Sequence, residues 1–222
     1  MSKVNLVGMT KPSAYTECRS AGDLIAYAAR VSNPTNQNNR KTAAKLIRYL
    51  IKENHWSPFE MVHIAMEITT TRDISRQILR HRSFSFQEFS QRYAVSESFL
   101  TRREARKAHP TNRQLSIKEE DPARQAKANE VFSEMQAEVC RVAKDYYEMA
   151  LNQGIAKEQA RALLPEGLTE TTLYMAGSLR NWIHYCDLRM GNGTQKEHSL
   201  IAAKCWDIIS GHFPDVAEAM YK

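Results

Sequence analysis

Arginine, histidine, serine and aromatic side chains gather in one stretch, Arg80-His81-Arg82-Ser83-Phe84-Ser85-Phe86-Gln87-Glu88-Phe89-Ser90-Gln91-Arg92-Tyr93. Arginine carries a planar fork that binds phosphate or carboxylate oxygens in pairs. A solvated basic face is one interpretation, but aromatic rings are poorly suited to such a face. Three potential cations at Arg80, His81 and Arg82 also repel one another unless an anion lies among them. We therefore predict a site for a phosphorylated ligand with planar rings.

The charge of the chain is concentrated around this stretch. The whole chain carries a net charge of +6, and residues 72–113 alone carry as much. A local basic patch suits a small polyanion at least as well as a nucleic acid. The four cysteines are far apart and form no Cys-x-x-Cys pair, which argues against a zinc site or a disulfide framework. We expect no metal and a reducing compartment.

The length and hydropathy of the chain predict one domain over residues 1–222. A chain of 222 residues can bury a substantial core. No apolar run approaches the roughly 18 residues of a membrane span, and the first residues do not form a signal peptide. We expect a cytoplasmic protein that does not bind membranes.

Regular elements on both sides of the stretch would position its arginines. Residues 62–68 alternate between apolar and mixed side chains, which predicts a strand with one buried face. Thr70-Thr71 would then cap a helix that carries Arg72, Arg76 and Arg80 on one flank. The arginines of the stretch would thus be presented by a rigid element.

Helices account for most of the remaining chain. Helices are predicted over residues 20–31 and 42–52, from Asp121-Pro122 to Gly154, and over residues 178–189. Strands are predicted over residues 4–9 and 171–175, and Thr194 with Glu197 would form a capping box for a further helix. Residues 96–121 lack periodicity, so we expect an exposed excursion there.

Together these pieces resemble the flavin-dependent thymidylate synthases. The signature of that family is Arg-His-Arg, seven residues, Ser, one residue and Arg, often followed by Tyr. Here it reads Arg80-His81-Arg82, then Ser83 to Phe89, then Ser90-Gln91-Arg92-Tyr93. His55-Trp56-Ser57-Pro58-Phe59-Glu60 resembles the family's His-x-Thr/Ser-Pro-Phe-Glu turn. Ala160-Arg161-Ala162-Leu163-Leu164-Pro165 and the segment from Ser178 to Arg189 resemble its two C-terminal ligand-binding pieces.

The match runs in the family's order from about His55 to Arg189, with two departures. Gln87 and Ser178 stand where many members of the family have Asn. Both replacements keep a polar side chain but change its reach. The resemblance implies an α/β fold of the α+β type, with a central, mostly antiparallel sheet flanked by helices. It also implies a homotetramer in which long helices form part of the interface and FAD is shared between subunits.

The resemblance also assigns residues to ligands. The substrate dUMP would be held by Gln77, Ile78, Leu79, Arg80, Glu88, Phe89, Ser90, Gln91, Arg92, Arg161 and Arg189. FAD would be held by Ser57, Arg80, His81, Arg82, Glu88, Ser178, Leu179, Arg180 and His184. The implied reaction is a reductive methylation, in which 5,10-methylenetetrahydrofolate supplies a methylene group to C5 of dUMP. A hydride from reduced FAD completes the methyl group, and NADPH reduces the flavin again.

C5 of uracil is a weak nucleophile, so the reaction needs stabilisation of negative charge over N3 and O4. An arginine aimed at those atoms supplies it, and the family position of this role is Arg189. Ser90 has no histidine base placed beside it by the sequence, which favours a positioning hydroxyl over a covalent nucleophile. No cysteine has the context of a nucleophile either. Two alternatives stay open: a basic nucleic-acid-binding protein and a flavoprotein of other chemistry.

Overall fold

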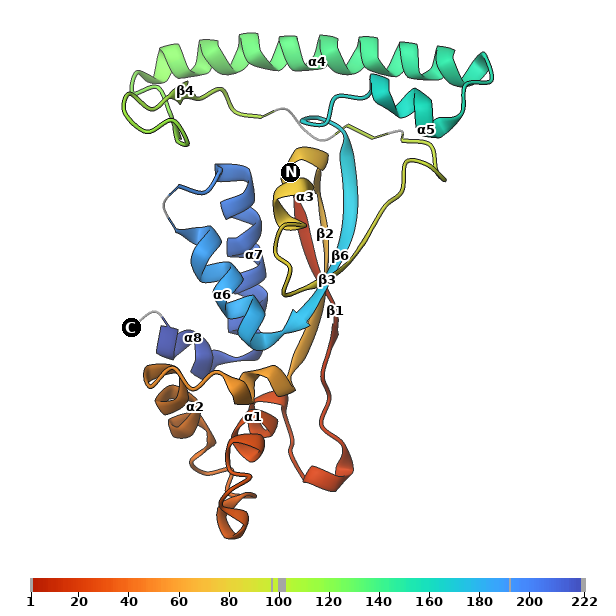
Figure 1. Cartoon of the computed structure of the whole chain (residues 1–222). Helices are drawn as coiled ribbons and strands as arrows, with labels where there is room; N and C mark the ends of the chain where they lie inside the picture. The colour runs from red at the N-terminus through yellow and green to blue at the C-terminus, as the bar shows by residue number, and fades with distance from the viewer. Residues whose placement is uncertain (1, 97, 100–102, 192, 221–222) are drawn as a thin grey trace.

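The computed structural model describes residues 2–96, 98–99, 103–191 and 193–220. Four strands form a wholly antiparallel sheet in the order β1-β2-β6-β3 (Figure 1). They are β1 (Lys3–Met9), β2 (His63–Thr71), β6 (Glu170–Ser178) and β3 (Ser85–Glu88). The antiparallel sheet and three of its strands are confirmed. The pattern did not predict β3, which lies within the signature stretch.

Alternation along β2 gives the sheet one core face. Ile64, Met66 and Ile68 are at most 2% exposed, and the facing residues of β6, Leu173 and Met175, are fully buried. The helices α6 (Leu179–Met190) and α7 (Lys196–His212) cover this face (Figure 1). The indole of Trp182 donates a hydrogen bond of 3.0 Å to the carbonyl oxygen of Ile64. That bond fixes α6 against the sheet and therefore fixes the polar side chains at both ends of α6.

Shorter elements close the end of the core near α1. They are α1 (Ala21–Ala29), α2 (Ala43–Lys52), α8 (Pro214–Met220) and the 3-10 helices η1 (Ala14–Thr16), η2 (Pro34–Asn36) and η3 (Ser57–Met61). α1 begins where Ser20 accepts a hydrogen bond from the amide of Asp23, as its N-cap sequence predicts. Arg48 of α2 pairs with Asp215 of α8 at 2.9 Å. η3 places the predicted Ser-Pro-Phe-Glu turn at the start of β2.

The long helix α4 (Pro122–Asn152) crosses the opposite end of the sheet (Figure 1). Asp121 caps it by accepting hydrogen bonds from the amides of Ala123 and Arg124. A second, small apolar cluster joins Tyr147 and Ala150 of α4 to the segment formed by α5 (Lys157–Ala160) and η4 (Arg161–Leu163). No helix in the described ranges is long and apolar enough to cross a membrane.

The excursion expected over residues 96–121 contains a short hairpin, of β4 (Lys107–Ala108) and β5 (Ser116–Ile117). Positions 97 and 100–102 of this segment lie outside the described residues. Arg103 anchors the segment to the body by donating to both carboxylate oxygens of Asp73, at 2.6 and 2.7 Å. Arg106 anchors it again through Glu197 at the start of α7. The segment is therefore tied down by partly buried ion pairs, although its sequence shows no periodicity.

Candidate active site

The end of α6 and the turn after α3 (Arg72–Ile78) meet at His81. The Nε of Arg189 donates a hydrogen bond of 2.8 Å to Nε2 of His81. The phenol ring of Tyr185 lies edge-on to the His81 ring at 4.9 Å between centroids. We call His81, Arg189, Tyr185, Gln77 and His198 the His81 cluster. It joins a residue predicted to bind dUMP to a residue predicted to bind FAD.

His81 accepts this hydrogen bond because it is neutral. Burial, the Arg189 guanidinium and the Arg80 guanidinium lower the pKa of His81 to about 4. Nε2 therefore carries a lone pair at neutral pH and the ring proton resides on Nδ1. Among the described residues only the Nε of Arg189 makes a hydrogen bond, so both of its terminal NH₂ groups remain able to bind a ligand edge.

A second group, the His184 cluster, lies at the beginning of α6. It consists of Trp56, Glu60, Ser178, Arg180 and His184. The Trp56 and His184 rings pack edge-to-face at 4.6 Å, and Arg180 forms an ion pair with Glu60. Burial, followed by the nearby Arg180 charge, lowers the pKa of His184. Ser178 is the N-cap of α6, where its hydroxyl accepts from the amide of Asn181 at 3.3 Å.

Ser178 therefore does what Asn does well at an N-cap, although its side chain is one atom shorter. Ser57, also predicted to bind FAD, begins the adjoining η3 and is exposed. Asn181 ties the Arg80–Ser83 turn to the same helix by donating to the carbonyl oxygen of Ser83 at 2.7 Å. The predicted FAD residues of η3, α6 and the signature stretch thus come from adjoining elements.

A third group, the Ser90 cluster, lies between the turn after β3 and α5. It contains Ser90, Arg92, Glu158 and Arg161. Nε of Arg92 lies 3.3 Å from a carboxylate oxygen of Glu158, and Nε of Arg161 donates to the main-chain oxygen of Glu158 at 3.1 Å. The hydroxyl of Ser90 accepts from the amide of Arg92 at 3.3 Å. Two arginines 69 positions apart in the sequence therefore converge on one short helix.

Glu88 is held inward by three groups, none of which was predicted to contact it. One of its carboxylate oxygens accepts from Ser75 at 2.8 Å and from Thr171 at 3.0 Å, and lies 3.8 Å from the Arg72 guanidinium. Its other oxygen has no hydrogen bond to the part of the chain that the structure describes, so it is available to a ligand. Arg72 is only 7% exposed, and its NH1 atom is buried without a hydrogen-bond partner in the described chain.

The predicted arginine flank of α3 is wrong in two respects. Arg72 is buried against Glu88 instead of exposed, and burial lowers its pKa more than the Glu88 charge raises it. α3 ends at Ile78, so Arg80 lies in the following turn and not on the helix. Arg80 and Arg82 are exposed, and neither makes a hydrogen bond or ion pair to the residues that the structure describes. Both guanidinium groups are available to an anion.

Several other predicted ligand residues direct their side chains into the protein. Ile78 and Leu179 are fully buried in the core, and Leu79 packs against it. Gln91 is 4% exposed and donates to the hydroxyl of Ser96 at 3.3 Å. The amide of Leu179 already donates to Val62, and that of Phe89 to Thr172. Contacts from these residues to a ligand would have to use other main-chain atoms or, for Phe89, its 38% exposed ring.

The predicted capping box at Thr194 does not form. α7 begins at Lys196, with Gln195 as its N-cap, and the Glu197 carboxylate binds Arg106 instead of turning back to the helix start. An ion pair with a distant arginine replaces the local capping bond. His198, on the same helix, is fully buried and was missed. Its position three residues before Ile201 and seven before Cys205, on the apolar face, was the available signal.

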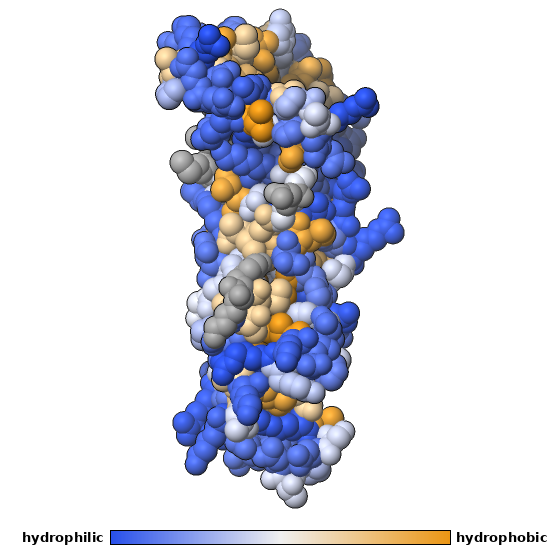
Figure 2. Space-filling model, turned by 90° about the vertical axis from the view of Figure 1, so that its left-hand side faces the viewer, coloured by the Kyte–Doolittle hydropathy of each residue, from blue (hydrophilic) through white to orange (hydrophobic). Residues whose placement is uncertain are grey.

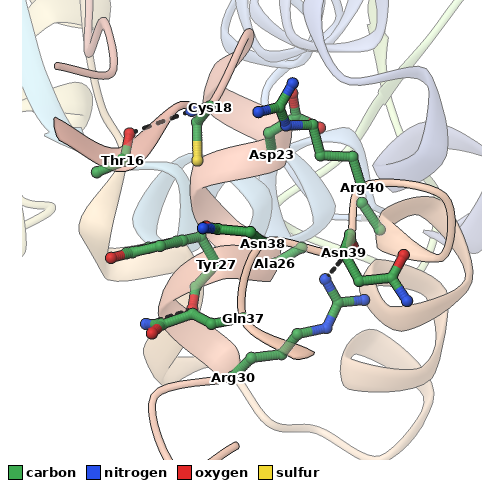
Figure 3. Close-up of a pocket in the computed structure, with 11 residues that line it drawn as sticks. Thr16, Cys18, Asp23, Ala26, Tyr27, Arg30, Gln37, Asn38, Asn39 and Arg40 are labelled. Atoms are coloured by element: carbon green, nitrogen blue, oxygen red, sulfur yellow. Dashed lines mark hydrogen bonds between the residues drawn. The ribbon is translucent and has the colours of Figure 1, made fainter. Parts of the chain in front are cut away.

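A separate cavity lies in the loop between α1 and α2, away from these clusters. Arg30 donates there to the carbonyl oxygen of Asn39 (Figure 3). It also donates, at 2.8 Å, to the hydroxyl of Thr42. The cavity measures about 10 Å³, which is room for about one water molecule. It is too small for a nucleotide, so it is part of the loop's own structure.

Comparison with known proteins identifies the family. A family model described as thymidylate synthase complementing protein (Thy1) matches residues 14–215. The chain is 47% identical over 219 residues to a flavin-dependent thymidylate synthase of Synechocystis sp., covering 98% of each chain. It is 45% identical over 218 residues to a probable flavin-dependent thymidylate synthase of Paramecium bursaria Chlorella virus 1, covering 97% of each.

A solved structure agrees in fold. The UMP/dUMP methylase PolB from Streptomyces cacaoi, bound with 5-Br dUMP, superposes with a TM-score of 0.80. The two chains are 26% identical, and the superposition covers 99% of this chain and 94% of the other. The chain therefore belongs to the Thy1 family, the flavin-dependent thymidylate synthases.

Proposed function

We propose that the three clusters form one active site, in which dUMP and FAD meet at the contact between Arg189 and His81. The protein is a flavin-dependent thymidylate synthase, a methyltransferase that converts dUMP into dTMP. The hydrogen bond of 2.8 Å between Arg189 and His81 is the observation that carries the proposal. It supports the proposal because it joins a residue predicted to bind the substrate to a residue predicted to bind the cofactor, within one chain.

The residues at the His184 cluster and the Arg80–Ser83 turn fit FAD. A diphosphate needs cationic partners, and the exposed Arg80 and Arg82 have none among the described residues. Ser57, Arg180 and His184 border the same region from η3 and α6. When bound there, FAD supplies the hydride that completes the new methyl group. We infer that NADPH is the reductant and 5,10-methylenetetrahydrofolate the carbon donor.

Arg189 would activate the pyrimidine. Negative charge over N3 and O4 of uracil makes C5 nucleophilic, and a fixed guanidinium stabilises that charge where it develops. The bond to His81 uses the Nε of Arg189 and leaves its two NH₂ groups able to donate to the pyrimidine. Because His81 is neutral, it holds Arg189 without adding a second positive charge that would repel it.

The Ser90 cluster would hold the phosphate of dUMP. Arg92 and Arg161 each use only Nε in the contacts described above, which leaves their NH₂ groups for phosphate oxygens. The Ser90 hydroxyl and the free oxygen of Glu88 would complete the pocket. Within the described chain Ser90 has no histidine in hydrogen-bond contact, which supports a positioning role over a nucleophilic one.

Cysteine chemistry has little support at this site. Cys186 and Cys205 are fully buried, and that burial raises the pKa of both thiols. A buried, protonated thiol is a poor nucleophile. Cys18 and Cys140 lie outside the three clusters. We infer that C5 is activated without a covalent bond from the enzyme to C6.

We also propose a homotetramer, built partly through α4. A stripe along that helix leaves Met135, Val139, Tyr146 and Met149 between 48% and 59% exposed. Beside it, residues of α4 and η4 line an apolar hollow of about 470 Å³. Exposed apolar stripes of this size mark contact surfaces. The side on which α6, α7 and α8 lie also shows a broken band of hydrophobic residues (Figure 2), which we infer to be a second contact surface between copies. From the family resemblance we propose that neighbouring copies share the FAD site.

The direct test is dTMP formation by the purified protein from dUMP, 5,10-methylenetetrahydrofolate, NADPH and FAD. We expect a yellow protein with flavin absorbance that forms dTMP only when all components are present. A colourless protein that binds DNA with a steep salt dependence would support the nucleic-acid alternative. A yellow protein that forms no dTMP would support a flavoprotein of other chemistry.

A further inference from the structure

A chain of hydrogen bonds runs from Tyr185 on α6 through the His81 cluster to Arg106, which lies in the segment of residues 96–121. The hydroxyl of Tyr185 lies 3.1 Å from Nε2 of His198, and Nδ1 of His198 lies 3.3 Å from Oε1 of Gln77. The amide nitrogen of Gln77 donates to Oε1 of Gln195 at 2.7 Å, and that of Gln195 donates to Glu197 at 3.0 Å.

The chain ends on a fixed charge. Arg106 donates to both carboxylate oxygens of Glu197, at 2.6 and 2.9 Å. Burial alone would raise the pKa of Glu197, but the hydrogen bonds from Arg106 and Gln195 lower it overall. Glu197 is therefore an ionised carboxylate, which can accept hydrogen bonds but cannot donate them.

This carboxylate determines the direction of every bond before it. Gln195 must turn its NH₂ group towards Glu197, so its oxygen faces Gln77 and accepts from the Gln77 amide. The oxygen of Gln77 then faces His198. His198 is neutral, since burial, Arg189 and His81 lower its pKa to about 3. Its one ring proton resides on Nδ1, facing Gln77, and Tyr185 donates to Nε2. Reversing any amide would place two acceptors or two donors in contact.

We propose that His198 and Gln195 are positioning residues that lock the carboxamide of Gln77, so that Gln77 presents one N–H and one lone pair to dUMP in a fixed order. The inference rests on the proposed function, in which Gln77 contacts the substrate. An unrestrained glutamine exchanges its oxygen and nitrogen by a half-turn and loses orientational entropy on binding. Here that order is set before the nucleotide arrives.

The test is a double-mutant cycle on dUMP binding by the FAD-loaded enzyme, measured by titration calorimetry. Gln77→Leu and Gln195→Leu should each raise the dUMP dissociation constant about tenfold, the equivalent of one hydrogen bond. The double variant should be no weaker than Gln77→Leu alone, because Gln195 acts only through Gln77. Lys204→Leu, an exposed change on the same helix, is the control and should match wild type.

Variants of His198 test the inference independently of the Gln195 variant. His198→Phe removes the N–H donor and should raise the dUMP dissociation constant about tenfold. His198→Asn keeps an N–H at the Nδ1 position, so its dissociation constant should stay within about threefold of wild type. The inference would be overturned if the Gln77→Leu/Gln195→Leu double variant lost affinity for dUMP by the product of the two single losses. It would also be overturned if the dUMP dissociation constant of Gln195→Leu were within twofold of wild type. A wild-type enzyme that binds no dUMP would instead overturn the proposed function.

Discussion

A guanidinium group can donate to an imidazole only when the imidazole is neutral, and the surroundings of His81 meet that condition. Its burial and the adjacent arginines lower its pKa to about 4. His198 behaves in the same way, with a pKa of about 3. Two neutral histidines thus lie near Arg189, the arginine proposed to face the substrate. A protonated ring at either position would repel that arginine.

The buried histidines predict a pH dependence of stability. The folded pKa of His198 is below its unfolded value of 6.5, so the unfolded chain binds a proton that the folded chain does not. Stability is therefore fully present above about pH 6.5 and falls as the pH drops towards 3, by up to about 1.4 kcal/mol per pH unit. Urea unfolding at pH 7, 6 and 5 measures this slope.

His198→Asn provides the control for this slope, because asparagine does not titrate. The variant should lose stability less steeply between pH 6.5 and 5 than wild type does. If both proteins show the same slope, His198 is not the source of the loss of stability at low pH.

Among the elements, β6 and the Arg80–Ser83 turn fit together through one glycine. A Cβ added at Gly177 would lie 2.6 Å from the ring of Phe84, which is itself 8% exposed and packs on Trp182 at 4.9 Å. The ring therefore has little room to move. Gly177 precedes Ser178, the N-cap of α6, so this close packing aligns the signature stretch with the end of α6 that we propose binds FAD.

Gly177→Ala should lower the free energy of unfolding by about 1–3 kcal/mol, because the methyl group overpacks the core. It should also weaken FAD binding, because Phe84 is displaced together with the turn that carries Arg80 and Arg82. Gly167→Ala, where no atom lies within 4 Å of the added Cβ, is the matched control. Urea unfolding and flavin content measure both effects. A Gly177→Ala enzyme as stable and as yellow as the control would contradict this packing account.

The sequence predicted those elements whose burial and capping depend on residues close by in the chain. The alternation in residues 62–68 and the cap at Asp121 both appear in the structure, because burial and capping there depend on near neighbours. β3 was missed because its alternation is masked by the polar residues of the site. The start of α7 was misplaced because Glu197 pairs with Arg106, 91 residues away. Partners at such distances leave no periodic pattern in a sequence.

The same distinction between local and distant contacts applies to the site. The signature motif predicted His81 and Ser90, and the family's C-terminal piece predicted Arg189, whereas several residues that contact the predicted site residues were not foreseen. Glu158, Thr171 and His198 come from elements whose spacing relative to the motif depends on the folded sheet. A single sequence does not record those contacts.

For the whole molecule, the exposed stripe on α4 predicts assembly. Met135→Glu places a charge in the middle of an apolar contact, so it should convert the proposed tetramer into smaller species and abolish flavin retention. Light scattering after size-exclusion chromatography measures the mass. Lys144→Glu, on the opposite side of α4, is the control and should remain a tetramer. A Met135→Glu protein with an unchanged mass would remove α4 from the interface.

The most direct test of the account is turnover by Arg189→Ala, compared with wild type and with Arg141→Ala, an exposed arginine on α4. Arg189 is assigned to charge that develops on uracil, so we expect dTMP formation to fall at least about 100-fold while the flavin content stays unchanged. Arg141→Ala should match wild type. If Arg189→Ala forms dTMP within tenfold of the wild-type rate, the claim that substrate and flavin meet at Arg189 and His81 is wrong.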